Sequence, residues 1–241
     1  MKKRIDILIR ERNLARSRSV AQRLIKKGLV KANGKIVNKP SEKVSPKAEI
    51  EIESKPKYVG RGGIKLEHAL KDFDIDVKGL KVLDVGSSTG GFTDCLIQHG
   101  ASHVYAVDVG KDQIDNSLKN LPNVSVFEQT DIRDLKELPN LVDLAVIDVS
   151  FISLTLVLNS IKKFLKPKGK IVALIKPQFE VGKKKVGKKG VVKSEETRKE
   201  AIDKIKKWSK SNGFNIIDLT KSRLEGDEGN VEYFIYLELN K

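Results

Sequence analysis

The sequence predicts an α/β protein, in which a mostly parallel sheet covered by helices on both faces follows a small N-terminal α+β module. From residue 81 onward, short apolar runs alternate with helical patterns, and a glycine-rich turn, SSTGG, joins the first run to a helix. Strands that alternate with helices form parallel βαβ units. The dipeptide Asn33-Gly34 between two short apolar runs indicates a hairpin, and therefore a different fold in the first quarter of the chain.

The N-terminal module is expected to contain two helices and a small sheet. Apolar residues have helical spacing over residues 4–12. A second helix is expected to start at a serine N-cap, Ser17 or Ser19, and to stop at Gly28. The hairpin and an alternating strand over residues 48–53 complete the module.

A linker is expected over residues 56–63 (PKYVGRGG), which combine a proline with three glycines. It separates an N-terminal domain, residues 1–55, from a larger domain, residues 64–241. The larger domain opens with an amphipathic helix expected over residues 64–73.

The larger domain then follows a regular alternation of strands and helices. Its last two strands are joined by GDEGN with no helix between them, which predicts an antiparallel edge. The expected strands cover residues 82–85, 104–107, 124–127, 144–149, 170–175, 215–219 and 231–239, and the expected helices cover residues 112–119, 153–165 and 195–212.

The positive charge of the chain is concentrated near its N-terminus. The net charge is +15 over 241 residues. Residues 1–64 contain 18 Lys/Arg and 6 Asp/Glu, a net charge of +12, whereas the other 177 residues contain 29 and 26, a net charge of +3. A basic module on a near-neutral domain indicates a polyanionic partner, most simply nucleic acid.

The sequence predicts a cytoplasmic protein. The single cysteine, Cys95, excludes an internal disulfide framework and is typical of a reducing compartment. The N-terminal stretch MKKRIDILIRER lacks the apolar core of a secretory signal. The most apolar stretch, residues 141–161, contains Asp143 and Asp148, so a membrane span is not expected.

The glycine-rich turn predicts a nucleoside site. It lies between a strand and a helix, where backbone can approach a ligand closely. The glycines at positions 86, 90 and 91 do not have the G-x-G-x-x-G spacing of dinucleotide sites, which favours a nucleoside without a pyrophosphate. Asp108 follows the next strand, where a carboxylate can accept both ribose hydroxyls.

Charged residues lie at or just past the ends of five of the expected strands. Ligands of open α/β sheets bind beyond the carboxyl ends of the strands, so these residues are candidates for one site, although each aspartate alone is more often a cap or turn residue. Asp131 and its neighbour Ile132 could reach an adenine edge. The five charged residues are Asp84, Asp108, Asp131, Asp148 and Lys176.

The N-terminal module resembles an S4 RNA-binding domain. The resemblance is carried by R-x-D at residues 4–6, S-R-S-x-A at 17–21, I-x-x-G at 25–28, V-x-x-N-G at 30–34 and K-P at 39–40. It implies contacts with structured RNA, although a solvated helix face is the alternative for each arginine alone. The RNA-contact candidates are Arg4, Arg16, Arg18, Arg23, Lys35 and, at the domain boundary, Arg61.

The larger domain resembles a class I S-adenosylmethionine-dependent methyltransferase with a Rossmann-like fold. Four motifs narrow the resemblance to the TlyA / haemolysin A family, ribosomal RNA 2′-O-ribose methyltransferases with an S4 domain and an FtsJ-like domain. They are RGGxKL at residues 61–66, DVGSSTGGFTD at 84–94, IDVSFISL at 147–154 and IKPQFE at 175–180. The cofactor contacts implied are Asp84, Gly86, Ser87, Gly90, Gly91, Phe92, Asp108, Asp131, Ile132 and Asp148.

The family's Lys-Asp-Lys-Glu tetrad matches Lys65, Asp148, Lys176 and Glu232, the last placed only by the closing strand. A ribose 2′-hydroxyl must lose its proton as it attacks a methyl group, and a free lysine is protonated at neutral pH. We expect the pKa of Lys176 to be lowered by burial, by the nearby charge of Lys65 and by the charge of the cofactor, so that Lys176 is neutral and acts as the base. Lys65 would also stabilise the alkoxide. Asp148 and Glu232 would orient the lysines. The alternative for Lys176 is a surface lysine before Pro177.

Other residues suggest competing chemistries that the pattern disfavours. The segment DVSF lacks the two prolines that amino-methyltransferases carry there, which argues against base N-methylation. Carbon-5 methylation needs a cysteine nucleophile beyond a late strand, whereas Cys95 follows the glycine turn. His99 and His103 have metal-like spacing with Cys95, but Gly100 separates a helix end from a strand start, so no metal is expected.

The sequence thus predicts an S-adenosylmethionine-dependent 2′-O-methyltransferase of ribosomal RNA, with cytidine and ribosomal subunits implied by the resemblance. One alternative is a non-catalytic RNA-binding or ribosome-assembly protein with a vestigial cofactor fold. Another, suggested by the family name, is a membrane-lytic protein, which no spanning segment supports. The oligomeric state stays open, and so does the role of residues 182–190 (GKKKVGKKG), either an RNA-contacting lid or a solvated loop.

Overall fold

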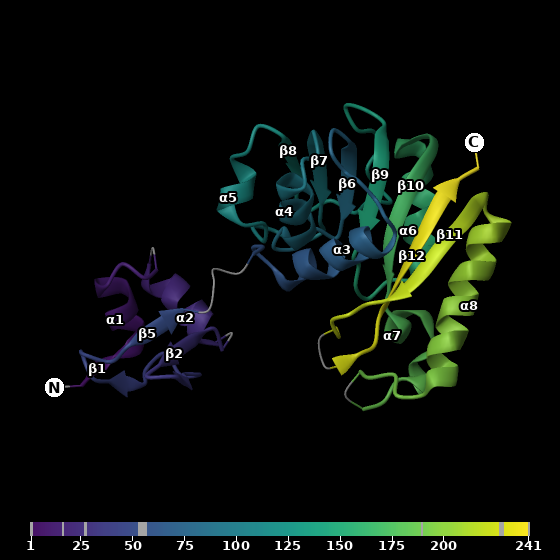
Figure 1. Ribbon diagram of the computed structural model, residues 1–241. Helices are drawn as coiled ribbons and strands as arrows, with labels where there is room; N and C mark the ends of the chain where they lie inside the picture. Colours follow the sequence, from purple (N-terminus) through teal and green to yellow (C-terminus); the bar gives the residue numbers. More distant parts are fainter. Residues whose placement is uncertain are drawn as a thin grey trace. The chain divides into compact units, whose positions relative to one another are not determined.

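The computed structural model describes residues 2–15, 17–26, 28–52, 57–188, 190–226 and 229–240. The chain divides into two compact units, Met1–Lys57 and Tyr58–Lys241 (Figure 1). Each unit has its own hydrophobic core. None of the helices in these described ranges combines the length and the apolar character that a bilayer span requires.

The first unit packs two helices against a three-stranded sheet of order β3-β2-β5. Ser17 is the N-cap of the second helix, because its Oγ accepts a hydrogen bond from the Val20 N–H (3.2 Å). Asn33 and Gly34 both have positive φ (49° and 74°), as a tight hairpin turn requires, which confirms the expected hairpin. The elements are β1 (Lys3–Arg4), α1 (Ile5–Glu11), α2 (Arg18–Lys26), β2 (Val30–Ala32), β3 (Lys35–Ile36), β4 (Lys43–Val44) and β5 (Ile50–Ile52).

The second unit is built on a seven-stranded sheet of order β11-β12-β10-β9-β6-β7-β8. The five strands from β10 to β8 are parallel, and β12 runs antiparallel to both β10 and β11, as the sequence predicts. The strands are β6 (Lys81–Val85), β7 (His103–Val107), β8 (Val124–Phe127), β9 (Val142–Ile147), β10 (Leu165–Ile175), β11 (Phe214–Lys221) and β12 (Tyr233–Leu239).

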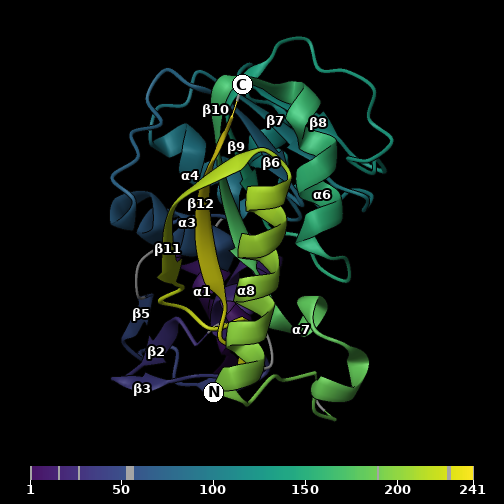
Figure 2. The same cartoon turned by 90° about the vertical axis from the view of Figure 1, so that its right-hand side faces the viewer.

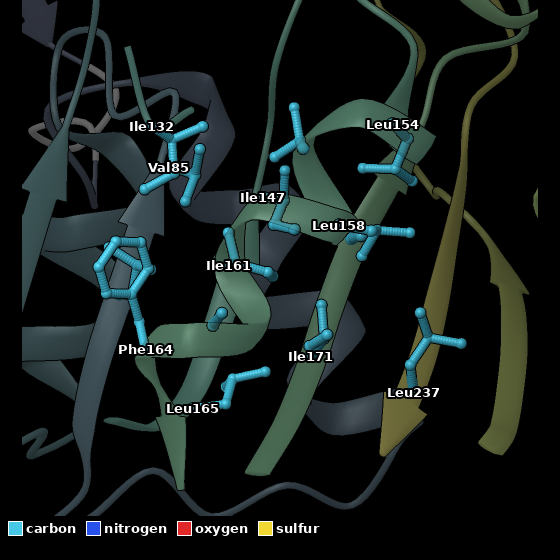
Figure 3. Packing of buried hydrophobic residues seen from close by; sticks show 14 of the residues in the cluster. Val85, Ile132, Ile147, Leu154, Leu158, Ile161, Phe164, Leu165, Ile171 and Leu237 are labelled. Carbon is cyan, nitrogen blue, oxygen red and sulfur yellow. The ribbon is translucent and has the colours of Figure 1, made fainter. Parts of the chain in front are cut away.

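Helices cover both faces of this sheet, α3 and α4 on one side and α6 and α8 on the other (Figure 2). Alternate strand residues therefore enter two separate cores. Figure 3 shows the core under α6, where Leu154, Leu158 and Ile161 pack on Ile147 and Ile171. The helices are α3 (Arg61–Asp72), α4 (Gly91–Gln98), α5 (Asn116–Lys119), α6 (Leu154–Ile161), α7 (Pro177–Glu180) and α8 (Glu195–Ser211), with 3₁₀ turns η1 (Lys162–Phe164) and η2 (Lys183–Lys185).

The segment expected as a linker over residues 56–63 differs from the expectation. Residues 53–56 lie outside the described ranges, but α3 begins at Arg61, three residues before the predicted start. Tyr58 is buried (2% exposed) and belongs to the core of the second unit. The physical reason is that the glycines allow close packing: the Tyr58 ring lies where a Gly63 side chain would be.

We predict that Gly63→Ala destabilises the second unit. The added Cβ would overlap the Tyr58 ring, and overpacking of a core costs about 1–3 kcal/mol. In a domain of this size each kcal/mol lowers the melting temperature by roughly 2–4 °C. Calorimetry measures the shift, with Gly182→Ala as control, because a Cβ at Gly182 meets no atom within 4 Å. Equal melting temperatures for the two variants would contradict the packing described.

Candidate active site

The glycine turn after β6 brings the backbone directly beside the end of β9. Gly86 has a φ of 81°, and a Cβ there would collide with the carbonyl oxygen of Asp148. Gly90 has a φ of 91°, and its Cβ would collide with Leu118. Both positions therefore need glycine for conformation as well as for space.

Asp84, the fourth residue of β6, is completely buried beneath this turn. Its Oδ2 accepts a hydrogen bond from the Thr93 hydroxyl (2.6 Å), while its Oδ1 has no hydrogen-bond partner among the described residues. Burial raises the pKa of Asp84 to about 7; the Thr93 hydrogen bond opposes this shift, and the negative charge of Asp148 adds to it. A buried oxygen without a partner is costly, so this atom marks a place for a polar ligand.

Asp108 follows β7 and is held by the backbone. Its Oδ2 accepts a hydrogen bond from the Ser88 N–H (2.7 Å), and its Oδ1 accepts one from the Gly110 N–H (2.7 Å). A carboxylate oxygen can accept more than one hydrogen bond. Asp108 is thus fixed at the strand end with acceptor capacity left for a ligand.

A cleft of about 380 Å³ lies at the carboxyl ends of the parallel strands. Asp131 at its border forms an ion pair with Arg133 (2.6 Å), and the hydrogen bond from Arg133 lowers the pKa of Asp131. The residues expected at the cofactor that line this cleft are Gly86, Asp108, Asp131, Ile132 and Asp148.

The other residues expected at the cofactor lie outside the described lining of the cleft. Ser87 is 5% exposed and Phe92 is 3% exposed. The Phe92 ring packs in the core beside Phe234 (6.3 Å between centroids), so a contact between Phe92 and the cofactor would have to come from its backbone. Gly91 is pressed against the backbone of α3, where a Cβ would lie 3.0 Å from the Gly63 nitrogen.

Two lysine–carboxylate pairs lie close to one another, and Asp148 of one pair lines the cleft. Lys65 of α3 pairs with Glu232 just before β12 (2.6 Å), and their side chains are 8% and 2% exposed. Lys176 at the end of β10 pairs with Asp148 at the end of β9 (2.6 Å), with 13% and 21% exposure. Lys176 Nζ also donates to Ser150 Oγ (2.9 Å).

These two pairs act on one another electrostatically. Burial raises the pKa of Glu232, the charges of Lys65 and Lys176 oppose the shift, and the charge of Asp148 adds to it. The structure therefore brings the four tetrad candidates together as two cations and two anions. Each lysine has a carboxylate as its nearest charged partner, whereas the sequence suggested a direct effect of one lysine on the other.

Two glycines, Gly62 and Gly226, leave space for the carboxylates of the two lysine–carboxylate pairs. A Cβ at Gly62 would lie 3.2 Å from the Phe92 ring and 4.0 Å from Asp148 Oδ2. A Cβ at Gly226 would overlap the Glu232 carboxylate. The motif RGGxKL thus contributes both Lys65 and the space beside Asp148.

Glu180 of α7 is a residue whose role the sequence did not reveal. Its side chain is 2% exposed, its Oε1 accepts from the Leu154 N–H (2.6 Å), and its Oε2 accepts from Ser153 Oγ (2.7 Å). Lys204 of α8 also donates to Oε2 (2.9 Å). Glu180 therefore ties the segment that follows Lys176 to the segment that follows Asp148. Its place in IKPQFE was visible, but only the fold shows what it contacts.

An aromatic side chain stands at the border of the cleft. Phe151 is 91% exposed, has a φ of 65° and lies 5.0 Å from the Phe179 ring, centroid to centroid. A large exposed ring in a left-handed conformation is rare for a structural residue. The sequence identified Phe151 only as part of a motif.

The expected RNA contacts are placed as follows. Arg18, Arg23 and Lys35 are exposed, Arg4 is half-buried, and Arg16 lies outside the described residues. In the second unit, Arg61 donates to the Glu225 carbonyl oxygen (3.3 Å).

Known proteins resemble both units. The model of the FtsJ-like methyltransferase family matches residues 58–239, and that of the S4 domain matches residues 3–50. The 16S/23S rRNA (cytidine-2′-O)-methyltransferase TlyA of Mycobacterium tuberculosis is 42% identical over 97% of this chain and 89% of its own. Hemolysin A of Brachyspira hyodysenteriae is 38% identical over 97% and 98%. A solved structure from Streptococcus thermophilus, assigned by name as a hemolysin, is 38% identical, with a TM-score of 0.78 over 100% of this chain and 89% of that one.

We predict that Asp84→Asn stabilises the second unit much more at pH 8 than at pH 4.5. The carboxyl ionises near 3.8 in the unfolded chain but near 7 in the folded one, so the folded state loses stability as the pH rises between these values. Asparagine keeps the shape and removes the charge. Melting curves at the two pH values measure the difference.

Asp143→Asn is the matched control, and its expected change in melting temperature at pH 8 has the opposite sign. The pKa of Asp143 is lowered, because the hydrogen bonds from Lys166 and the Lys81 N–H outweigh its burial. Its replacement is therefore expected to lower the melting temperature at pH 8. An Asp84→Asn effect that is the same at both pH values would show that Asp84 does not carry the buried charge described.

Proposed function

Since this chain belongs to the TlyA / haemolysin A family of FtsJ-like methyltransferases with an S4 domain, we propose that it transfers a methyl group from S-adenosylmethionine to a ribose 2′-oxygen of ribosomal RNA. The observation that carries this proposal is the cluster of two lysines and two carboxylates beside a nucleoside-sized cleft. A hydroxyl nucleophile needs a proton acceptor and a cation for its developing charge, and this cluster offers both.

The residues around the cleft fit S-adenosylmethionine. Asp108 can accept from the ribose hydroxyls, the border of Asp131 and Ile132 suits the adenine, and Gly86 allows backbone to approach. The Oδ1 of Asp84, which no described residue contacts with a hydrogen bond, can accept one from a polar group of the ligand, directly or through water. When bound, this cofactor supplies an electrophilic methyl group on a positively charged sulfur.

In this proposal Lys176 accepts the proton that the 2′-hydroxyl loses. Asp148 and Ser150 fix its amino group through contacts of 2.6 and 2.9 Å. Lys65 stabilises the negative charge on the 2′-oxygen, and Glu232 holds Lys65 in place (2.6 Å). Glu180 keeps the segments after β9 and β10 in register, and so preserves the Lys176–Asp148 pair.

Charge balance supports the assignment of the base. Two ammonium groups and two carboxylates sum to zero, so a bound sulfonium would leave the cluster with one surplus positive charge. In a site this poorly exposed, such an excess favours the loss of one proton from a lysine. Lys176 is the more exposed of the two lysines, at 13% against 8%. It therefore meets the substrate more readily.

The substrate is proposed from the S4 domain and the family. The basic first unit would hold structured RNA, and Phe151 would offer its exposed ring to a base beside the target ribose. The named relative acts on cytidines of 16S and 23S rRNA, and we propose cytidine in ribosomal subunits here as well. Such a substrate would place the reaction in the cytoplasm.

The test of the reaction uses methyl-labelled S-adenosylmethionine and separated ribosomal subunits that lack the modification. Alkali cleaves RNA through the free 2′-hydroxyl, so a 2′-O-methyl group leaves an alkali-resistant dinucleotide. We expect the label in dinucleotides. Label in mononucleotides would show base methylation, and cofactor binding without any transfer would favour a non-catalytic RNA-binding protein.

We predict that Lys176→Ala and Lys176→Arg both lose about 10²–10⁴-fold in kcat, the usual contribution of a general base, while cofactor affinity changes little. Arginine can keep the pair with Asp148 but cannot take up a proton at neutral pH. Single-turnover methyl transfer at saturating cofactor measures the loss. Lys199→Ala, an exposed position on α8, is the control. Near-normal activity of the arginine variant would assign Lys176 a purely electrostatic role.

A further inference from the structure

The first unit contains a completely buried carboxylate, Asp6, on which two arginines converge. Asp6 lies in the first turn of α1. Its Oδ1 accepts from Arg4 Nε (3.0 Å), and its Oδ2 accepts from Arg4 Nη2 (3.1 Å), Arg18 Nε (2.9 Å) and Gln22 Nε2 (2.8 Å). Two guanidinium groups, one from β1 and one from α2, are thus held at a single buried oxygen.

This arrangement depends on the negative charge of Asp6. Two guanidinium groups this close repel one another unless an anion lies between them. Burial alone would raise the pKa of Asp6, but the hydrogen bonds from Arg4, Gln22 and Arg18 outweigh it and hold the pKa well below its usual range. The carboxylate is therefore ionised at any physiological pH, so its attraction for both arginines does not depend on pH in that range.

The contacts with Asp6 use only part of the donors of each arginine. Arg18 binds through Nε, which leaves both of its terminal nitrogens without a partner in the described part of the chain. Arg4 binds through Nε and Nη2, so its Nη1 has no hydrogen-bond partner among the residues that the structure describes. The side chains of Arg4 and Arg18 are 38% and 50% exposed, so these remaining N–H groups can reach a ligand outside. Planar guanidinium groups with fixed orientation match the oxygens of a phosphate.

We propose that Asp6 is a positioning residue for RNA binding, which holds Arg4 and Arg18 side by side as a preorganised phosphate-binding pair. The inference rests on the proposed function, in which the first unit binds RNA. Two long side chains that are already ordered lose less conformational entropy on binding than two mobile ones. A buried negative charge therefore strengthens the binding of a polyanion.

A simple count of charges predicts the opposite effect of an Asp6 substitution on RNA affinity. Asp6→Asn makes the protein more positive by one unit, and electrostatics alone predicts tighter RNA binding. If Asp6 positions the arginines, the same change weakens binding, because Arg4 and Arg18 then repel one another and lose their fixed geometry. The sign of the change thus separates positioning from simple charge.

The experiment measures binding of the full-length protein to deproteinised ribosomal RNA over a series of salt concentrations. We expect Asp6→Asn to weaken binding by roughly tenfold and to reduce the slope of log K against log[salt] by about 0.7–0.9 for each phosphate that the arginines no longer neutralise. Glu49→Gln, which removes one exposed negative charge from the same unit, is the control, and it is expected to bind equally or slightly more tightly.

A double-mutant cycle excludes a general loosening of the unit. In an Arg4→Gln/Arg18→Gln background, Asp6→Asn is expected to cause no further loss, because it acts only through these two side chains. Gln22→Ala, which removes a neutral hydrogen-bond donor to Asp6, is expected to weaken binding less in the wild-type background. If Asp6→Asn causes no further loss of RNA binding in the double-arginine background, Asp6 acts by positioning these arginines, even if the variant has a lower melting temperature.

Two results would overturn the inference alone: Asp6→Asn binding as tightly as the wild type, or an equal loss in the double-arginine background. Failure of the wild type itself to bind ribosomal RNA is a different result. It would contradict the proposed function, and the inference would fall with it.

Discussion

A buried ammonium group needs a carboxylate partner, and this requirement joins the candidate active site to the order of the sheet. Lys65 is 8% exposed, and without Glu232 its charge would be strongly destabilising in that position. The two residues are 167 positions apart in the chain. They meet only because β12 inserts between β10 and β11 and brings the residue before it to the start of α3. The antiparallel end of the sheet thus positions one of the two lysine–carboxylate pairs.

Close approach of backbone segments is the second condition for the cluster. Asp148 lies beside the glycine turn only because Gly86 has no side chain, and Glu232 has space because Gly226 has none. Glu180 then holds the segments after β9 and β10 together through hydrogen bonds from Ser153 and Leu154, and a third from Lys204 ties it to α8. The geometry of two pairs at 2.6 Å therefore depends on residues outside the pairs themselves.

The fold was largely predictable because it follows from local patterns. Alternating apolar runs and turn residues located the seven main strands, and the absence of a helix before the last strand indicated its antiparallel direction. The role of Tyr58 was not predictable, because a lone aromatic residue among glycines looks like linker until its partner Gly63 is known. The strand-end rule brought Asp108 and Asp148 to one cleft, whereas the family resemblance did not reveal that the Phe92 ring packs in the core.

Both units use carboxylates to fix cations, and this changes how the basic charge of the chain should be understood. The first 64 residues carry a net charge of +12, but not all of it is available to a polyanion. Arg12 uses its guanidinium group within the unit: it donates to the carbonyl oxygens of Ala48 and Pro46 and so connects the end of α1 to the segment before β5. Arg4 and Arg18 share Asp6, so their pair presents a net charge of only +1 with a fixed orientation. A ligand with irregular phosphate positions gains little from such a surface, whereas a folded RNA with fixed phosphates gains both charge and geometry. Selectivity for structured RNA can therefore arise in the first unit without contacts to bases.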